Sequence, residues 1–245
     1  RTISNDFARR IGEKVSEKHI RFAGDEDLVD LVWTDRPALS CEPLWELEPK
    51  FAGYTRAEKL EKVREKMNEL GADVFVIPAL DEIAWLLNLR GGDVLYTPVF
   101  LSYLLLERGK ATLCVQKEAV SAEIEAHLAA DGVALAPYDD IYPLVASLPK
   151  GTRVLLDGER ANYRITQSVG TGVETIDRPS PIQLMKAMKH PAEQENERIA
   201  HIRDGVAVTR FIYWLKHTIG KETITEMSAA KKLESLRAEG EHFLD

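Results

Sequence analysis

The feature that most constrains the fold is an alternation of extended and helical apolar patterns between residues 55 and 176. Short apolar runs typical of buried strands occur at 73–77, 99–106, 111–115, 133–137, 153–157 and 172–176. Helical patterns separate them at 55–70, 81–87, 119–130, 139–148 and 162–169. Strands that alternate with helices, with one hairpin among them, indicate a sheet whose faces are covered by helices. The sequence therefore predicts an α/β domain with a mixed sheet over residues 45–181.

The clearest local signals lie at the start of this region. Thr55 and Glu58 have the spacing of a capping box, in which each side chain accepts a hydrogen bond from a backbone N–H at a helix start. Gly71 predicts the end of that helix, since glycine readily adopts the left-handed conformation that closes helices. The apolar stripe between them consists of Leu60, Val63, Met67 and Leu70. Residues 107–110 predict a hairpin connection with Gly109 at positive φ.

The flanks of this domain have weaker patterns. Residues 4–18 predict a helix and residues 19–22 a short strand, followed by a proline-containing stretch typical of a linker. We therefore expect residues 1–44 to be the tail of a preceding domain plus a linker. A strand at 182–188, a helix at 190–217 and a further helix from Thr225 predict the incomplete start of a third domain over 182–245. Both ends of the chain are thus expected to be internal positions of a longer protein.

Composition narrows the classes of function. Lys plus Arg number 32 against 40 Asp plus Glu, which gives a formal net charge of −8. The sequence has no stripe of basic residues of the kind that binds nucleic acid or an anionic membrane. The longest apolar run, 99–106, is far shorter than the roughly 20 residues of a membrane helix, and no signal peptide opens the chain. Cys41 and Cys114 form no disulfide framework or ligand pattern, which favours a reducing compartment. We expect a cytoplasmic protein that binds neither nucleic acid nor membranes.

One helix face is a candidate metal site. Glu197, His201 and Asp204 project from the same side of the helix predicted at 190–217, and His190, His217 and His242 lie in the same part of the chain. A dinuclear carboxylate site takes its ligands from two or more helices, and only this one is present. The favoured interpretation is a polar helix end that leads into a segment with apolar stripes on both sides, buried within a larger domain.

Other catalytic motifs are missing. Neither residues 91–92 nor residues 170–172 have the glycine, lysine and element order of a phosphate-binding loop. No nucleophile elbow occurs, and neither cysteine has a histidine nearby in sequence. The acidic pairs at 81–82 and 139–140 lie at predicted helix starts, where the helix dipole accounts for them.

Residues 79–93 form the remaining candidate. An apolar helix there ends directly at a turn that carries Asn88 and Arg90, which we expect at an exposed helix end. In the structural interpretation, Trp85 anchors the core and Arg90 is a cation at the helix C-terminus. In the functional interpretation, Asn88 and Arg90 line a substrate cleft. The residue types by themselves favour the structural interpretation.

The same segment carries a resemblance to a known family. Residues 80–91 (LDEIAWLLNLRG), with Asp93 and residues 98–100 (PVF), resemble the middle domain of three-domain Xaa-Pro aminopeptidases, a creatinase/prolidase N-terminal-like domain. Residues 33–37 (WTDRP) resemble the linker before that domain. Residues 189–193 (KHPAE) and 200–207 (AHIRDGVA) resemble the start of the family's catalytic pita-bread domain. The resemblance extends over nearly the whole chain from about Asp25, with the segments in the family's order.

The resemblance implies a metallopeptidase that removes an N-terminal residue when proline follows it. The family uses two divalent metal ions, usually manganese, held by two Asp, one His and two Glu of the later catalytic domain. None of those motifs lies in this sequence, so the resemblance implies no metal ligand and no catalytic residue here. It also implies a homodimer formed through the catalytic domain, and peptides with proline at the second position as substrates.

Two alternatives stay open. Pita-bread relatives that lack the metal serve as protein-binding modules, and a prolidase that cleaves dipeptides shares the fold. In the leading interpretation the chain is a non-catalytic portion that shapes the cleft entrance and supports the catalytic domain, with Asn88 and Arg90 nearest the cleft. The chain on its own is then expected to be inactive.

Overall fold

The computed structural model of the chain describes residues 3–24, 28–29 and 31–244. They form two compact units. The first takes in the described residues of 1–48 together with 54–188, and the second combines 49–53 with the described residues from 189 onward. The domain boundaries expected from the sequence, after residues 44 and 181, stay predictions.

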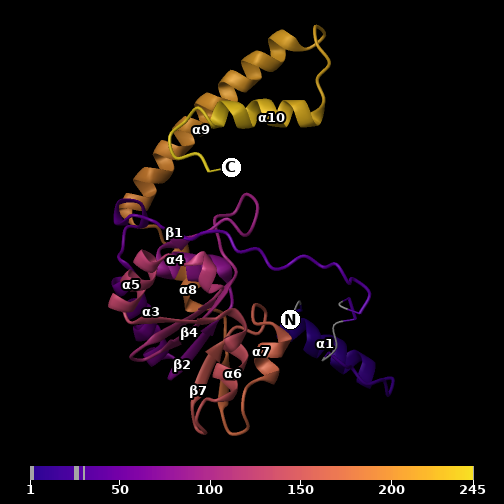
Figure 1. Ribbon diagram of the computed structural model, residues 1–245, viewed down its shortest axis with the longest axis vertical. Coiled ribbons are helices and arrows are strands. Elements are labelled where there is room, and N and C mark those ends of the chain that lie inside the picture. The colour runs from indigo at the N-terminus through magenta and orange to yellow at the C-terminus, as the bar shows by residue number, and fades with distance from the viewer. Residues whose placement is uncertain (1–2, 25–27, 30, 245) are drawn as a thin grey trace. The chain divides into compact units, whose positions relative to one another are not determined.

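A six-stranded sheet forms the centre of the first unit, with the strand order β6-β5-β4-β2-β7-β8 (Figure 1). The strands are β2 (Val74–Ile77), β4 (Ser102–Glu107), β5 (Ala111–Val115), β6 (Val133–Pro137), β7 (Arg153–Leu156) and β8 (Glu174–Asp177). β4 is antiparallel to both β2 and β5, whereas β5–β6, β2–β7 and β7–β8 are parallel pairs. Five strands therefore run in one direction and β4 in the other, which confirms the predicted mixed sheet.

Helices cover both faces of this sheet. They are α3 (Arg56–Glu69), α4 (Leu80–Leu87), α5 (Ala122–Ala130), α6 (Ile141–Ala146), α7 (Tyr163–Gln167) and α8 (Pro181–Ala187), with 3₁₀ turns η1 (Lys117–Ala119) and η2 (Tyr138–Asp140). Phe75 and Ile77 belong to one apolar cluster, with α3, α4, α5 and α8. Val74 and Val76 belong to the other, with α6 and α7. Because side chains alternate along a strand, one short run of β2 contributes to two cores.

Helix α3 forms as its sequence predicts. Thr55 and Glu58 complete the capping box, with Glu58 N to Thr55 Oγ1 at 3.3 Å and Thr55 N to Glu58 Oε2 at 2.8 Å. Gly71 follows the helix at φ +72°, as expected of a closing glycine. The hairpin between β4 and β5 is also confirmed, but Gly109 does not have the positive φ that we expected. The chain therefore turns at this position without the left-handed conformation that glycine would supply.

Two predicted strands are wrong. Residues 19–22 form no strand, because His19 at φ +57° closes the preceding helix α1 (Asn5–Ser16) in a turn, with Ile20 N bonded to Val15 O at 3.0 Å. Residues 182–188 are mostly helix α8, which Ser180 caps and which has Pro181 in its first turn. Proline at a helix start loses no hydrogen bond, so this signal outweighs the apolar run that follows.

The chain before α3 is tied to the first unit at two places. Asn5 N of α1 donates to Ala161 O at 2.8 Å, and Thr166 Oγ1 of α7 donates to Asn5 Oδ1 at 2.8 Å. Further along, β1 (Trp45–Glu46) forms a two-stranded antiparallel sheet with β3 (Leu89–Arg90). The second contact joins residues 45–46, at the start of the predicted middle domain, to the strand that follows α4.

The second unit consists of α2 (Pro49–Ala52), α9 (Pro191–Thr218) and α10 (Glu226–Arg237). α10 packs along α9, and the ion pairs Arg237–Asp204 (2.6 Å) and Arg210–Glu239 (2.6 Å) link the two segments. In one apolar stripe of α9, Ile202 and Val206 are 69% and 55% exposed, so the expected burial of this helix within a larger domain stays a prediction. Within the described parts of the chain, no helix is long and apolar enough to cross a bilayer.

Candidate functional site

The turn after α4 carries the two site residues that the sequence singled out. Asn88 is the C-cap of α4 and adopts the left-handed conformation, φ 53° and ψ 34°. Asparagine tolerates this conformation better than most residues, which explains its place at the helix end. We expected Asn88 at an exposed helix end, and this is wrong, because Asn88 is only 6% exposed.

Burial of Asn88 follows from its partner Lys59, which is 1% exposed. Lys59 Nζ donates to Asn88 Oδ1 at 2.7 Å and to Trp85 O at 3.0 Å, and it lies 4.4 Å from the centre of the Trp85 ring. Asn88 Nδ2 in turn donates to Tyr54 O at 2.9 Å. A buried ammonium needs such compensation for its lost hydration. Asn88 therefore joins α3, α4 and the segment before α3.

Arg90 lies two residues further, in β3, and is partly buried. Its Nη1 donates to Ala84 O at 2.8 Å and to Leu89 O at 2.9 Å. Ala84 O belongs to the last turn of α4, so Arg90 is the helix C-terminal cation of the structural interpretation. Trp85 is 8% exposed and belongs to the larger apolar cluster, as that interpretation expects. The structure brings Asn88 and Arg90 to one helix end, where both side chains form hydrogen bonds with other residues of the first unit.

A pocket lies elsewhere in the first unit, at the carboxyl edge of the sheet. The chain leaves β2 toward β4 on one side and later returns to β7 on the other, so the strand order reverses between β2 and β7. The connection after β2 leads into α4 and that after β7 leads to α7, on opposite faces of the sheet. Such a switch point leaves a crevice between the two connections, where open α/β sheets bind ligands.

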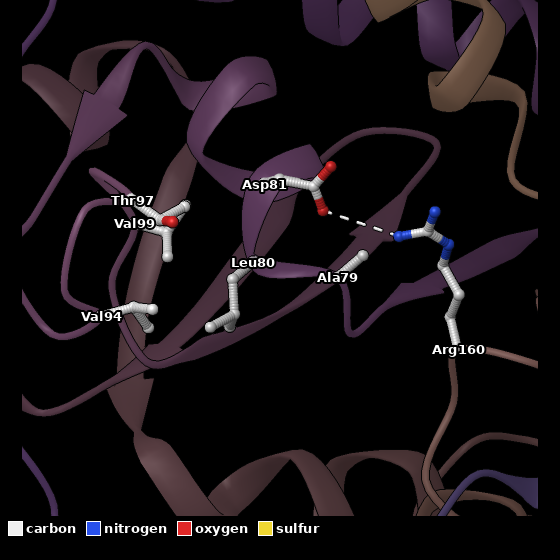
Figure 2. A pocket seen from close by; sticks show the side chains of 7 residues that line it. All are labelled: Ala79, Leu80, Asp81, Val94, Thr97, Val99 and Arg160. Carbon is white, nitrogen blue, oxygen red and sulfur yellow. Dashed lines mark ion pairs between the residues drawn. The ribbon is translucent and has the colours of Figure 1, made fainter. Parts of the chain in front are cut away.

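The pocket has a volume of about 420 Å³ and is open to solvent. It is lined by Ala79, Leu80, Asp81, Val94, Thr97, Val99 and Arg160. Figure 2 shows Leu80 and Asp81 between the Val94, Thr97 and Val99 side chains on one side and the Arg160 guanidinium on the other. The wall is mostly aliphatic, and two opposite charges lie at one end of it.

The charged end combines groups from three elements. Asp81 pairs with Arg160 at 3.6 Å and accepts a hydrogen bond from Lys186 of α8. Burial disfavours the ionised form of Asp81, but the hydrogen bond and charge of Lys186 outweigh this and lower the pKa of the carboxyl. The neighbouring Glu82 is 1% exposed, and its burial raises its pKa although Ser180 Oγ donates to Glu82 Oε2 at 2.6 Å.

The described residues do not fit a metal centre. No three His, Cys, Asp or Glu side chains of these residues come together as a group that could hold an ion. On the candidate face of α9, Asp204 pairs with Arg237, while His201 Nε2 lies 3.8 Å from Glu197 Oε1. His190 serves as the N-cap of α9, where its Nδ1 accepts a hydrogen bond from Ala192 N at 3.1 Å. The histidine-rich end of the chain therefore has structural contacts at these positions.

Sequence reasoning missed the pocket and Arg160. The sequence marked Asp81 only as an acidic residue at a helix start. Nothing in the sequence around Arg160 indicated that it would pair with a carboxylate. The parallel pairing of β2 with β7 brings the two residues together. A strand-order prediction would have been needed to find the crevice.

The fold and its helical cover define a class of protein. Residues 35–193 match the creatinase/prolidase N-terminal domain family, so the chain belongs to that family. The matched range begins within the segment that resembles the linker and includes the six-stranded sheet and α8.

Particular relatives narrow the comparison to Xaa-Pro aminopeptidases, which confirms the resemblance. A probable Xaa-Pro aminopeptidase P of Sclerotinia sclerotiorum is 36% identical over 99% of this chain and 42% of its own length. The X-prolyl aminopeptidase of Caenorhabditis elegans, described as a cytosolic enzyme with a di-nuclear active site, superposes with a TM-score of 0.90 at 27% identity. That match covers 99% of this chain and 40% of the other.

A Xaa-Pro dipeptidase of Bacillus anthracis matches with a TM-score of 0.52 at 12% identity, over 76% of this chain and 49% of the other, which shows the fold alone. The chain thus spans about two fifths of the length of the aminopeptidase relatives named above.

Proposed function

We propose that this chain is the non-catalytic portion of a metal-dependent Xaa-Pro aminopeptidase that releases the N-terminal residue preceding proline. One observation carries the proposal: the aminopeptidase of Caenorhabditis elegans matches 99% of this chain, across both compact units, with a TM-score of 0.90. The dipeptidase match covers less of the chain at lower identity. A prolidase would act on dipeptides, so longer peptides with proline second are the substrates that distinguish the two.

The metal ions of the proposed enzyme would be two divalent cations, with manganese as the proposed identity. The printed description of the Caenorhabditis elegans relative names a di-nuclear active site, which supports the number of ions. The described residues of this chain do not fit such a centre. Activating a water molecule requires several anionic ligands around a divalent ion and a positioned acid or base. We therefore expect the ligands outside residues 1–245, and the chain by itself to be inactive.

The role proposed for the first unit is to shape the entrance of the catalytic cleft and to support the catalytic domain. Asn88 and Arg90 are the proposed cleft residues. Asn88 bonds through both its amide oxygen and its amide nitrogen, so its contribution would be to hold the turn in place. Arg90 is partly exposed, which makes it the member of the pair that could reach a peptide.

The remaining features of the proposed enzyme follow its family. Its partners would be peptides with proline at the second position and a second copy of the chain, joined through the catalytic domain. A cytoplasmic location is proposed because the structural relative is described as cytosolic.

The test compares two proteins with the same peptides. Purified 1–245 and the full-length protein are assayed on Xaa-Pro tripeptides and Xaa-Pro dipeptides, with and without manganese. We expect turnover of tripeptides by the full-length protein only. A full-length protein inactive on both substrate classes would favour the metal-free binding module, and activity on dipeptides alone would favour prolidase.

The cleft role has its own test in the full-length enzyme. The double variant Asn88→Ala, Arg90→Ala is expected to lower kcat/KM on short Xaa-Pro peptides. The single variant Arg90→Ala separates peptide contact from loss of the Asn88 hydrogen bonds. An unchanged kcat/KM in a folded double variant would remove the proposal for these residues.

A further inference from the structure

The pocket between β2 and β7 has the features of a small-molecule site, and no role proposed for the chain uses it. Its lining comes from three separate segments: the connection after β2, the loop before β4, and the connection after β7. Both connections leave the carboxyl ends of parallel neighbours toward opposite faces of the sheet. Open α/β sheets place ligands in such a crevice.

Arg160 gives this pocket a donor group that the fold leaves largely unused. Its guanidinium pairs with Asp81 at 3.6 Å, longer than a hydrogen bond, and makes no hydrogen bond to any other residue that the structure describes. The side chain is 40% exposed. The planar fork of arginine suits the two oxygens of a carboxylate, which it binds through parallel hydrogen bonds.

The charges around the pocket favour an anion over a cation. Lys186 and Arg160 are both positive and share the single carboxylate of Asp81. Two further acidic groups lie nearby, and both are buried: Glu82 accepts a hydrogen bond from Ser180 Oγ, and Asp157 accepts hydrogen bonds from the Ser180 and Glu159 backbone N–H groups and from Gln183. An incoming carboxylate would complete the guanidinium's hydrogen bonds, whereas an ammonium would compete with two cations for Asp81.

The rest of the pocket wall indicates which chemical group is attached to the carboxylate of the ligand. Leu80, Val94 and Val99 present aliphatic surface beside the charged end, as Figure 2 shows. Burial of aliphatic groups against such a wall is favourable in proportion to the area removed from water. A ligand that fits both parts has a carboxylate at one end and a small branched apolar group next to it.

We propose that this pocket binds the carboxylate of a small aliphatic acid, with the free carboxyl end of a peptide ending in leucine or valine as the occupant. Arg160 binds the carboxylate, and Leu80, Val94 and Val99 contact the aliphatic side chain. The proposal concerns a site distinct from Asn88 and Arg90, and it does not depend on the proposed aminopeptidase activity.

The test uses the 245-residue chain, labelled with ¹⁵N, and N-acetyl-leucine as the probe. We expect saturable shifts of the backbone amides of residues 79–81, 97, 99 and 160, with a Kd on the order of 1 mM for so small a ligand. N-acetyl-leucine amide, which lacks the carboxylate, should bind at least 10-fold more weakly. 4-Methylpentanoate distinguishes a free acid from a peptide end, which should bind more tightly through its amide group.

Variants separate the pocket from general charge effects. Arg160→Gln should weaken binding at least 10-fold, while the matched control Arg178→Gln, an exposed arginine outside the pocket, should leave it unchanged. Val94→Asp, on a 38% exposed wall position, is a second test that does not rely on Arg160 and should also abolish binding. Equal binding of acid and amide, undiminished binding by Arg160→Gln, or no shifts at 10 mM probe would each overturn the proposal.

Discussion

The Lys59 ammonium donates a hydrogen bond to Asn88 Oδ1 across 2.7 Å, and both side chains are buried. This contact joins the first turn of α3 to the residue that ends α4. The contact explains why an asparagine ends this apolar helix. Asn88 adopts the left-handed conformation there, and its amide oxygen accepts a hydrogen bond from the buried Lys59 ammonium.

Asn88→Ala is expected to lower the free energy of unfolding by about 2–3 kcal/mol, since a hydrogen bond to a buried charge is lost and a β-carbon without a compensating amide remains at positive φ. Urea unfolding followed by circular dichroism measures the change. Asn88→Gly is the matched control, because it removes the same hydrogen bonds without backbone strain, and it should lie between the wild type and Asn88→Ala. An alanine variant as stable as the wild type would contradict the buried bond.

Asp73 predicts a loss of stability in acid. Its carboxylate accepts hydrogen bonds from the Arg153 side chain and backbone and from Arg108, which hold the pKa of Asp73 at about 2, below its usual 3.8. Because the pKa of Asp73 is lower in the folded than in the unfolded chain, the carboxylate stabilises the fold at pH values above its usual pKa. This stabilisation is lost as the pH falls from about 4 through 2. Asp73→Asn should therefore cost about 1–2 kcal/mol at pH 7 and progressively less below pH 4.

Thermal unfolding from pH 2 to pH 7 checks this. The exposed Glu61→Gln is the control, and it should follow the wild type across the range. A constant difference between Asp73→Asn and the wild type at every pH would refute the linkage to the Asp73 carboxyl.

For Glu82 we expect the opposite dependence of stability on pH. Burial raises the pKa of Glu82 above its usual 4.5, and its Oε1 has no hydrogen-bond partner among the described residues. Because the pKa of Glu82 is higher in the folded than in the unfolded chain, this group contributes stability that is fully present at pH values below its usual pKa. The contribution is lost as the pH rises through the folded-state pKa. Glu82→Gln should remove this decline, so its stability relative to the wild type should increase as the pH rises above about 4.5.

The same pH series with Glu61→Gln as control measures this. The slope is the decisive quantity, because the glutamine amide changes the absolute stability through its own buried N–H groups. Parallel curves for Glu82→Gln and the wild type would show that Glu82 does not titrate differently in the folded state.

The two cysteines should differ in reactivity. Burial raises the pKa of the Cys114 thiol to about 12, and the side chain is fully enclosed in β5. Cys41 is partly exposed, although burial and then the charge of Glu118 raise its pKa as well. Because the thiolate is the reactive form, a neutral disulfide reagent at pH 8 should modify Cys41 slowly and Cys114 only after unfolding.

Cys41→Ser provides the control for this assay and should show no reactive thiol in the native state. Two thiols that react at similar rates in the native wild type would show that the β5 side of the sheet opens readily.

Much of the fold could be predicted because its signals are local. The capping box at Thr55 and the closing Gly71 define α3 within a few residues, and the apolar runs locate the strands. The errors arose where a short-range signal was undervalued. Ser180 and Pro181 start a helix in a run that looks extended, and His19 closes one where a strand was expected.

The candidate site was less predictable, since its properties depend on residues distant in sequence. Asn88 was singled out from the sequence, but its burial goes with that of Lys59, which lies within the predicted helix 55–70 and which no motif singled out. Arg90 as a helix-end cation needed only its neighbours and was anticipated.

The sequence by itself determined most of the helices and the six main strands of the central domain, its family and the absence of the family's ligand motifs from these residues, but not β1, α2 or β3. These properties lie in local patterns and in the order of short motifs along the chain. The tertiary structure alone decided that Asn88 is buried against Lys59 and that Asp81 meets Arg160 at a crevice. The physical reason is that both contacts join residues far apart in sequence. The first depends on the packing of α3 against α4, and the second on the parallel pairing of β2 with β7.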